Sequence, residues 1–189
     1  TVTGNTVTAR NPGTGLYLNL AGVLPENINV SNNNLRSSFG YGMYLMNIAG
    51  PYELPNSNDV KYSGVTWAAC DSNAPAAAIY LEGVSNITLR NFDLGSSSCY
   101  GVRMSGTNTN VTLDRILTND RWFRSITTWG TTTNTNLVIK NSIFGPSSSG
   151  VGLAGLAGSI EISNNDFSPK GSGGFYLQAP ELYLDMAGI

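Results

Sequence analysis

The chain has 189 residues, a length that fits one domain, and no change in composition marks a boundary within residues 1–189. Charged residues make up 12% of the chain and the formal net charge is -2, so it lacks the basic field that nucleic acid or anionic lipid requires. Histidine is absent, which removes the commonest general base and a frequent metal ligand. We therefore expect no nucleic-acid partner, no metal and no cofactor. No apolar run reaches the roughly 18 residues of a membrane-spanning helix, so no membrane insertion is expected.

Stretches in which apolar and polar residues alternate recur along the chain, and most of them close with Asn or Gly. This period-2 pattern predicts β-strands with one buried face. The copies of this first strand type are residues 2–5, 28–32, 60–64, 87–91, 111–115, 137–141 and 160–164, with a truncated eighth copy at 182–185.

A second strand type follows each copy of the first and opens with Gly or another small residue. Its copies are residues 15–18, 42–45, 78–81, 101–104, 125–128, 150–153 and 174–177. Two strands in a repeat of about 25 residues cannot bury their apolar faces alone, so the repeats must stack on one another. The predicted fold is all-β, a solenoid of about seven parallel coils. We expect Ile87, Leu89, Leu113, Ile139 and Ile162 to point inward.

The residue that closes the first strand is predicted to turn a sharp corner. Asn suits this position because it tolerates left-handed backbone angles, and its amide can bond the same amide in the next coil. In the fifth coil the corner residue is Arg115, and the same coil has Thr118 and Thr128 at otherwise apolar positions. Such a break in the pattern is where function or strain is expected first.

Two segments carry a recognisable motif, residues 30–35 (Val-Ser-Asn-Asn-Asn-Leu) and residues 162–167 (Ile-Ser-Asn-Asn-Asp-Phe). This pattern resembles the right-handed parallel β-helix repeats of the pectate-lyase-like superfamily. The resemblance covers essentially the whole chain and implies a right-handed, single-stranded coil. The superfamily contains polysaccharide lyases and hydrolases, phage tailspikes and surface adhesins, so the fold alone does not identify an activity. The Gly-His-Gly element of the pectin hydrolases and an Arg-Ile-Lys run are both missing, which argues against those enzyme families.

The outward positions of the second strand type hold Tyr17, Tyr44, Tyr80 and Arg103 in successive coils. We call this column the tyrosine strip. Two residues further along each strand lie Asn19, Met46, Glu82 and Ser105. A flat aromatic strip bordered by amides and a carboxylate suits sugar rings, whose apolar faces stack on aromatic rings. The alternatives are that the tyrosines stabilise the sheet surface, or that a neighbouring chain covers them.

The first strand type places Arg90, Asp114 and Lys140 in one outward column. Alternating charges one coil apart suit an exposed ladder of salt bridges. The other interpretation is a catalytic carboxylate held between two cations.

Residues 119–124 form the most charged and aromatic turn of the chain. In a β-elimination on a uronic acid, Asp120 would be the base, Arg121 and Arg124 would stabilise charge, and Trp122 would stack on the sugar. The alternative is a hydrophobic flap with its charges in solvent. Residues 47–58, which contain two prolines, are predicted to be a plain surface loop, and the alternative is a loop that walls one side of the tyrosine strip.

Cys70 and Cys99 fall in neighbouring coils. Since coils stack at roughly 4.8 Å, a disulfide between them is geometrically allowed, and two free buried thiols are the alternative. A bridge together with sparse charge would favour an extracellular or cell-surface setting.

The leading hypothesis is a non-catalytic extracellular or surface β-solenoid scaffold, adhesin-like, with a side face for polysaccharide or for neighbouring protein chains. The rival hypotheses are a polysaccharide lyase or hydrolase, with Asp114 joining the turn residues, and the shaft of a viral tail fibre. The chain begins and ends inside repeats, so we expect a segment of a longer protein or association at the ends, including assembly into a homo-oligomer.

Overall fold

The computed structural model describes residues 1–9, 13–24, 28–37, 40–54, 58–62, 76–94, 99–118, 124–128, 132–144, 151–166, 175–178 and 184–185. Within these residues every regular element is a β-strand. The strands are β1 (Val2–Thr3), β2 (Thr6–Ala9), β3 (Leu16–Asn19), β4 (Val30–Ser31), β5 (Asn34–Ser37), β6 (Tyr41–Met46), β7 (Ala49–Leu54), β8 (Asp59–Tyr62), β9 (Ala77–Glu82), β10 (Ser85–Asp93), β11 (Tyr100–Ser105), β12 (Thr107–Thr118), β13 (Arg124–Thr128), β14 (Thr133–Lys140), β15 (Ile143–Phe144), β16 (Val151–Ala154), β17 (Leu156–Ser163), β18 (Phe175–Gln178) and β19 (Leu184–Asp185).

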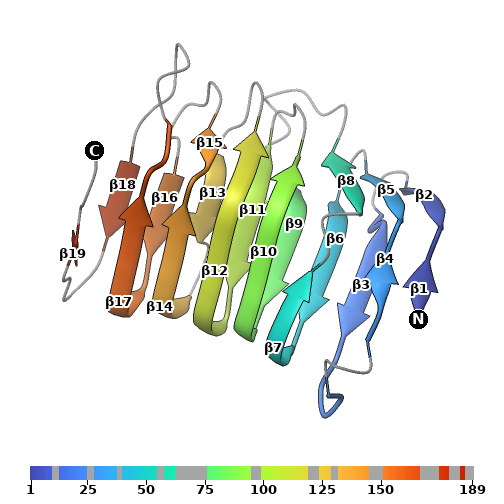
Figure 1. Cartoon of the computed structure of the whole chain (residues 1–189), viewed down its shortest axis with the longest axis horizontal. Coiled ribbons are helices and arrows are strands. Elements are labelled where there is room, and N and C mark those ends of the chain that lie inside the picture. Colours follow the sequence, from blue (N-terminus) through green and yellow to red (C-terminus); the bar gives the residue numbers. More distant parts are fainter. Residues whose placement is uncertain are drawn as a thin grey trace.

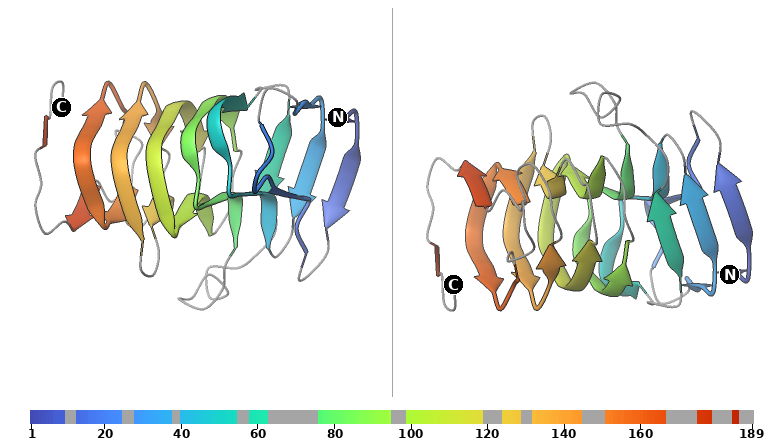
Figure 2. Two further views of the ribbon diagram at one scale, coloured as in Figure 1. Left: turned by 90° about the horizontal axis from the view of Figure 1, so that it is seen from below. Right: turned by 90° about the horizontal axis from the view of Figure 1, so that it is seen from above.

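The strands build long parallel sheets that run the length of the molecule, with β1 near one end and β19 at the other (Figures 1 and 2). One sheet has the order β18-β16-β13-β11-β9-β6-β3, and a second has the order β19-β17-β14-β12-β10-β7, with β15 beside β12. Two smaller sheets, β1-β4 and β2-β5-β8, complete the first coils. Hydrogen-bonded neighbours are parallel and come from successive repeats, as in the pairing of β10 with β12. The predicted all-β solenoid of parallel coils is therefore confirmed, whereas its right hand stays a prediction.

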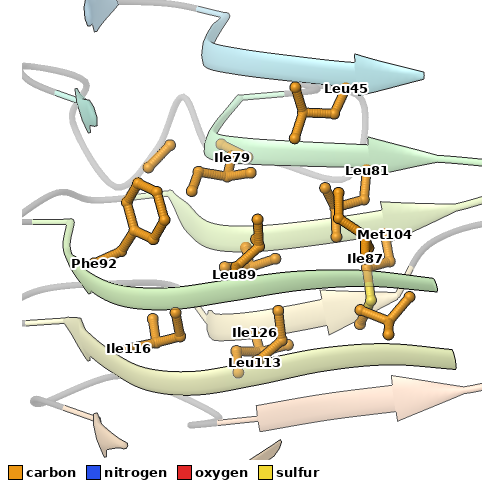
Figure 3. Packing of buried hydrophobic residues seen from close by; sticks show 14 of the residues in the cluster. Leu45, Ile79, Leu81, Ile87, Leu89, Phe92, Met104, Leu113, Ile116 and Ile126 are labelled. Carbon is orange, nitrogen blue, oxygen red and sulfur yellow. The ribbon is translucent and has the colours of Figure 1, made fainter. Parts of the chain in front are cut away.

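Apolar residues of successive coils lie above one another and fill the interior (Figure 3). Leu89, Leu113, Ile139 and Ile162 occupy one column of the second sheet, and each is at most 2% exposed. Full burial of such a side chain stabilises a fold by about 1.5 to 3 kcal/mol, so these columns dominate stability. The inward orientation predicted for them, and for Ile87, is confirmed.

The third coil does not follow the predicted path. Val60 pairs with Leu35 on the small β2-β5-β8 sheet, not with the first strand type of its neighbours. That strand is supplied by β7, where Leu54 pairs with Leu89 and both Tyr52 and Leu54 are buried. The prediction that residues 47–58 form a surface loop was thus wrong. A register shift between Ser85 and Ile87 accommodates Pro51, and β7 is the outermost strand of its sheet, where proline is tolerated.

Left-handed backbone angles recur at the corners, as predicted. Asn32, Asn91, Asn141 and Asn164 have φ of 56°, 61°, 54° and 52°. The amide ladders run in other columns than the one predicted. In one of them Asn110 Nδ2 donates to Asn86 Oδ1 at 2.7 Å, and Asn136 Nδ2 donates to Asn110 Oδ1 at 2.9 Å. At these corners Asn adopts the left-handed backbone at a lower energetic cost than most other residues with a side chain would.

Arg115 has φ of 57° at the corner that Asn91 and Asn141 occupy in the adjacent coils. We expect Arg115→Asn to raise the free energy of unfolding by about 1 kcal/mol, because Asn adopts left-handed angles at lower cost. Arg115→Ala is the control, since it removes the guanidinium but keeps the strain. Urea unfolding of the three proteins measures both effects. The difference between the unmodified protein and Arg115→Ala gives the contribution of the guanidinium, and an Arg115→Asn variant that is no more stable than Arg115→Ala would contradict the expected relief of backbone strain.

Candidate functional site

The register of β3, β6, β9 and β11 brings the predicted tyrosine strip together. The strand pairing places one column of residues along the sheet, in the order Tyr17, Tyr44, Tyr80 and Arg103. The adjacent column, two residues on, contains Asn19, Met46, Glu82 and Ser105. The order of these residues along the solenoid is as the repeats predict.

The rings of the strip are not arranged as a flat platform. Tyr17 and Tyr44 meet edge to face at 4.9 Å with an interplanar angle of 77°, and Tyr44 and Tyr80 do so at 4.7 Å and 70°. Tyr41, which sequence reasoning missed, stacks on Tyr80 at 4.5 Å with an angle of 9°. We call Tyr17, Tyr41, Tyr44 and Tyr80 the tyrosine cluster. Its edge-to-face contacts stabilise the surface of the sheet in addition to the area they bury.

Exposure falls steeply along the column, so only its first part is open to a ligand. Tyr17 is 53% exposed and Tyr44 is half-buried, but Tyr80 is 9% exposed and Arg103 is 6% exposed. The guanidinium carbon of Arg103 lies 5.6 Å from the ring centroid of Tyr80 and 5.5 Å from that of Tyr100. This cation–π packing holds Arg103 inside the molecule. The expectation of an exposed strip across all these coils is therefore corrected to a contact area in the first two.

Two phenol groups of the cluster donate hydrogen bonds to neighbouring side chains. The Tyr44 hydroxyl donates to Glu82 Oε2, and the Tyr17 hydroxyl donates to Met46 Sδ at 3.2 Å. Burial, followed by the hydrogen bond to Glu82 and the charge of that carboxylate, raises the pKa of Tyr44. Burial and the neighbouring Tyr80 likewise raise the pKa of Tyr41. Neutral donors beside one carboxylate are suited to binding hydroxyl-rich ligands, and not to proton transfer near neutral pH.

The charged column on the second sheet has the predicted register, with Arg90 opposite Asp114 and Asp114 opposite Lys140. Arg90 Nε donates to Asp114 Oδ2 at 3.0 Å, and Arg90 Nη1 donates to the Glu53 carboxylate at 3.1 Å. Asn141 Nδ2 donates to Asp114 Oδ1 at 2.9 Å. The predicted exposure of Asp114 was wrong, because this residue is 4% exposed.

The ionised form of Asp114 is the favoured one. Burial alone would raise the pKa of Asp114, but the hydrogen bonds from Asn141 and Arg90 and the charge of Arg115 together lower it. Each carboxylate oxygen of Asp114 accepts a hydrogen bond, so the geometry is that of a structural ion pair between Asp114 and Arg90.

The two described members of the predicted catalytic group belong to different sheets. Asp114 is on β12 of the second sheet and Arg124 is on β13 of the first. The side chain of Arg124 lies over Gly152, and its Nη1 donates to Thr127 Oγ1 at 3.3 Å. Asp120, Arg121 and Trp122 lie outside the described residues. The fifth coil does contain a buried polar pair, Thr118 Oγ1 and Ser125 Oγ at 2.8 Å, which accounts for the polar residue at position 118.

Cys99 is buried and disulfide-bonded. Cys70, the other cysteine of the sequence, lies outside the described residues, so the pairing of the two stays a prediction. Over the described part of the chain no group of three or more Cys, Asp or Glu side chains is arranged to hold a metal ion. Nor does this part contain a helix long and apolar enough to span a membrane.

Fold and site together define a parallel β-solenoid with a partly open tyrosine cluster on one side face. Comparisons of the chain with protein-family models, curated proteins and solved structures each found no match.

Proposed function

We propose that the chain is a non-catalytic β-solenoid scaffold of the cell surface or extracellular space, whose tyrosine cluster contacts glycans. The observation that carries the proposal is the 53% exposure of Tyr17 beside the half-buried Tyr44. Aromatic rings of this kind suit the apolar faces of sugar rings, and the neighbouring Glu82 and Asn19 suit sugar hydroxyls. The disulfide at Cys99 supports an oxidising compartment.

The contact area favours a short stretch of glycan. The ring of Tyr17 and the outer edge of Tyr44 offer stacking, while Asn47 Nδ2 donates to Asn19 Oδ1 at 3.1 Å and fixes the amides at the border of the cluster. A fixed border costs a ligand less ordering entropy than mobile side chains would. The parallel coils and their Asn-rich corners support membership of the pectate-lyase-like superfamily as part of this proposal, with surface adhesins as the functional analogue.

A polysaccharide lyase is the second candidate, and Asp114 between Arg90 and Arg115 is the observation in its favour. That carboxylate is buried and engaged by two donors, which argues for structure over catalysis. A viral tail-fibre shaft is the third candidate, and no specific observation favours it over the scaffold.

The proposal is tested by affinity electrophoresis of the protein through gels that contain a glucan, a mannan, a galactan or polygalacturonate. We expect retardation by at least one polymer and a loss of about 1 to 3 kcal/mol of binding free energy in Tyr17→Ala, the scale of one aromatic stacking platform. Tyr17→Phe is the matched control and should bind normally, since it keeps the ring. Tyr44→Ala is a poorer probe, because Tyr44 packs against three other rings and its loss also lowers stability.

Two outcomes contradict the proposal. The first is unretarded migration in all four gels. The second is release of an unsaturated uronate from polygalacturonate, read by ultraviolet absorbance, which would establish the lyase.

A further inference from the structure

Glu82 places a carboxylate beside the tyrosine cluster. It lies on β9, is partly exposed, and accepts the hydrogen bond of the Tyr44 hydroxyl on Oε2. Within the described part of the chain, its Oε1 accepts no hydrogen bond and the carboxylate forms no ion pair. Nor does Oε1 belong to the polar atoms of this part that are both buried and without a partner, so it is open to solvent. One oxygen of this carboxylate is therefore accessible to a ligand.

The hydrogen-bonding groups around Glu82 are mainly acceptors. The hydroxyl proton of Tyr44 is used in the bond to Glu82, and that of Tyr17 is used in the bond to Met46 Sδ at 3.2 Å. A phenol has a single O–H, so the oxygens of Tyr17 and Tyr44 face a ligand as acceptors only. The amide N–H groups of Asn19, at the other border of the cluster, are donors for an ordinary sugar hydroxyl. Around Glu82, the complementary ligand group is one that is rich in donors.

The rings of the cluster are arranged in a way that attracts positive charge. The guanidinium of Arg103 already packs on the rings of Tyr80 and Tyr100, with its central carbon 5.6 and 5.5 Å from the two ring centroids. Tyr17, in the same column as Tyr80, presents its ring to solvent with 53% exposure. Aromatic rings next to a carboxylate are the combination that recognises an ammonium group.

The exposed ring and the carboxylate are linked by contacts but belong to different coils. Tyr17 is on β3 and Glu82 on β9, with β6 between them. Parallel strands are about 4.8 Å apart, so these two positions are separated by roughly 10 Å across the sheet. Met46 lies between them and accepts from the hydroxyls of both Tyr17 and Tyr44. A glycan that stacks on Tyr17 therefore has to extend across β6 to reach Glu82, which favours an oligosaccharide over a single sugar.

We propose that the glycan bound by the tyrosine cluster carries free amino groups, as polymers of glucosamine do, with an ammonium group on Glu82 Oε1 and a sugar ring on Tyr17. This inference rests on the proposed glycan contact and names its substrate class. An ammonium group has three donors and no acceptor, and its bond to a carboxylate is charge-assisted. N-acetylation removes the charge and adds a carbonyl acceptor, which does not match the acceptors around Glu82. A neutral glucan offers a hydroxyl at the same position and binds more weakly.

The test is isothermal titration calorimetry with hexamers of glucosamine, N-acetylglucosamine and glucose that share one backbone linkage. The unmodified chain should bind the glucosamine hexamer at least about tenfold more tightly than the other two, the scale of a hydrogen bond to a charged group. Glu82→Gln keeps an acceptor for the Tyr44 hydroxyl but removes the charge. This variant should bind the glucosamine hexamer no more tightly than the glucose hexamer.

Glu161→Gln is the matched control, because it removes the same charge from an exposed position on β17 of the second sheet. It should keep the full preference for the glucosamine hexamer. Equal losses in Glu82→Gln and Glu161→Gln would mean that net charge alone attracts the amino sugar, and would overturn the inference. The ranking of the three hexamers uses the unmodified chain, so it does not depend on how well Glu82→Gln folds.

The inference and the proposed function fail in different ways. If the unmodified chain binds all three hexamers equally, and Tyr17→Ala weakens each of them, the inference is overturned and the glycan contact stands. If the chain binds none of the hexamers, the inference is overturned as well, and the four polymer gels decide whether the proposed function fails with it.

Discussion

Replacing Gly155 by alanine is expected to destabilise the solenoid by more than about 4 kcal/mol, a loss reserved for severe steric or burial defects. Gly155 has φ of +64° at a corner before β17, and a Cβ placed there would lie 1.7 Å from the backbone oxygen of Thr132 in the coil below. The obstacle is backbone, so no side-chain rotation relieves it. Relief requires that the two coils separate, and separation breaks the bond from Asn134 N to Gly155 O, which is 2.7 Å long.

Gly106→Ala is the matched control. Gly106 has nearly the same φ of +69°, but the nearest atom to its added Cβ is Gly83 N at 3.4 Å, an ordinary contact. Its cost should be that of left-handed backbone alone, about 1 to 2 kcal/mol. Urea unfolding of both variants separates close packing of coils from backbone strain. Equal losses in the two variants would show that the contact with Thr132 is relieved at little cost.

The sequence was sufficient to predict the class of fold because the burial of apolar side chains dominates the stability of this fold. The apolar columns through Leu89 and Ile79 leave few ways to bury alternating strands other than by stacking the repeats in register. The left-handed corners were also predictable, because Asn tolerates left-handed backbone angles and recurs where the backbone must turn.

The path of the third coil was not predicted, because periodicity does not reveal which alternating stretch belongs to which face. Residues 60–62 alternate as clearly as Ile87 and Leu89 do, yet they belong to another sheet. The true strand, β7, contains Gly50 and Pro51, and these residues hide its pattern. A bulge at these two residues, which together oppose the single residue Asn86 of β10, restores the register, and bulges have no simple sequence signature.

The order of residues in the candidate site was predicted, but their environment was not. Register follows from the repeats, so Tyr17, Tyr44 and Tyr80 were correctly placed in one column. Ring angles and burial depend on neighbours outside the column. Tyr41 starts its strand one position before the repeated glycine and pairs with Ala77, a small residue that leaves room for its stacking on Tyr80. The repeat pattern begins the strand at the glycine, so it assigns Tyr41 to the preceding turn and does not predict that Tyr41 belongs to the site.

Asp114 shows the same limit at a charged position. Alternation marks it as outward, and an outward carboxylate is expected to be solvated. Arg90 and Asn141 instead close over it from the coils on either side. An outward position in a solenoid is therefore buried when both neighbouring coils carry side chains long enough to cover it.

Asp114→Asn is expected to lower the free energy of unfolding at neutral pH by about 1 to 3 kcal/mol, the scale of hydrogen bonds to a charged group. The substitution keeps the shape of the side chain but removes the charge that pairs with Arg90, and it also weakens the acceptor for Asn141. Arg90 keeps its contact with Glu53 and is 38% exposed at its side chain, so its charge is not stranded in the interior.

The loss should depend on pH in a defined direction. The pKa of Asp114 is lower in the folded chain than in the unfolded chain, where it has the ordinary value of about 3.9. Its stabilisation is therefore fully present above that value and is lost as pH falls through the folded pKa. Urea unfolding of the two proteins from neutral to acidic pH should show a gap that narrows below pH 4 or so. Glu53→Gln is the control, because its exposed pair with Arg90 is worth about 1 kcal/mol or less. A gap that stays constant with pH would mean that shape and packing, and not the ionised carboxylate, account for the role of Asp114.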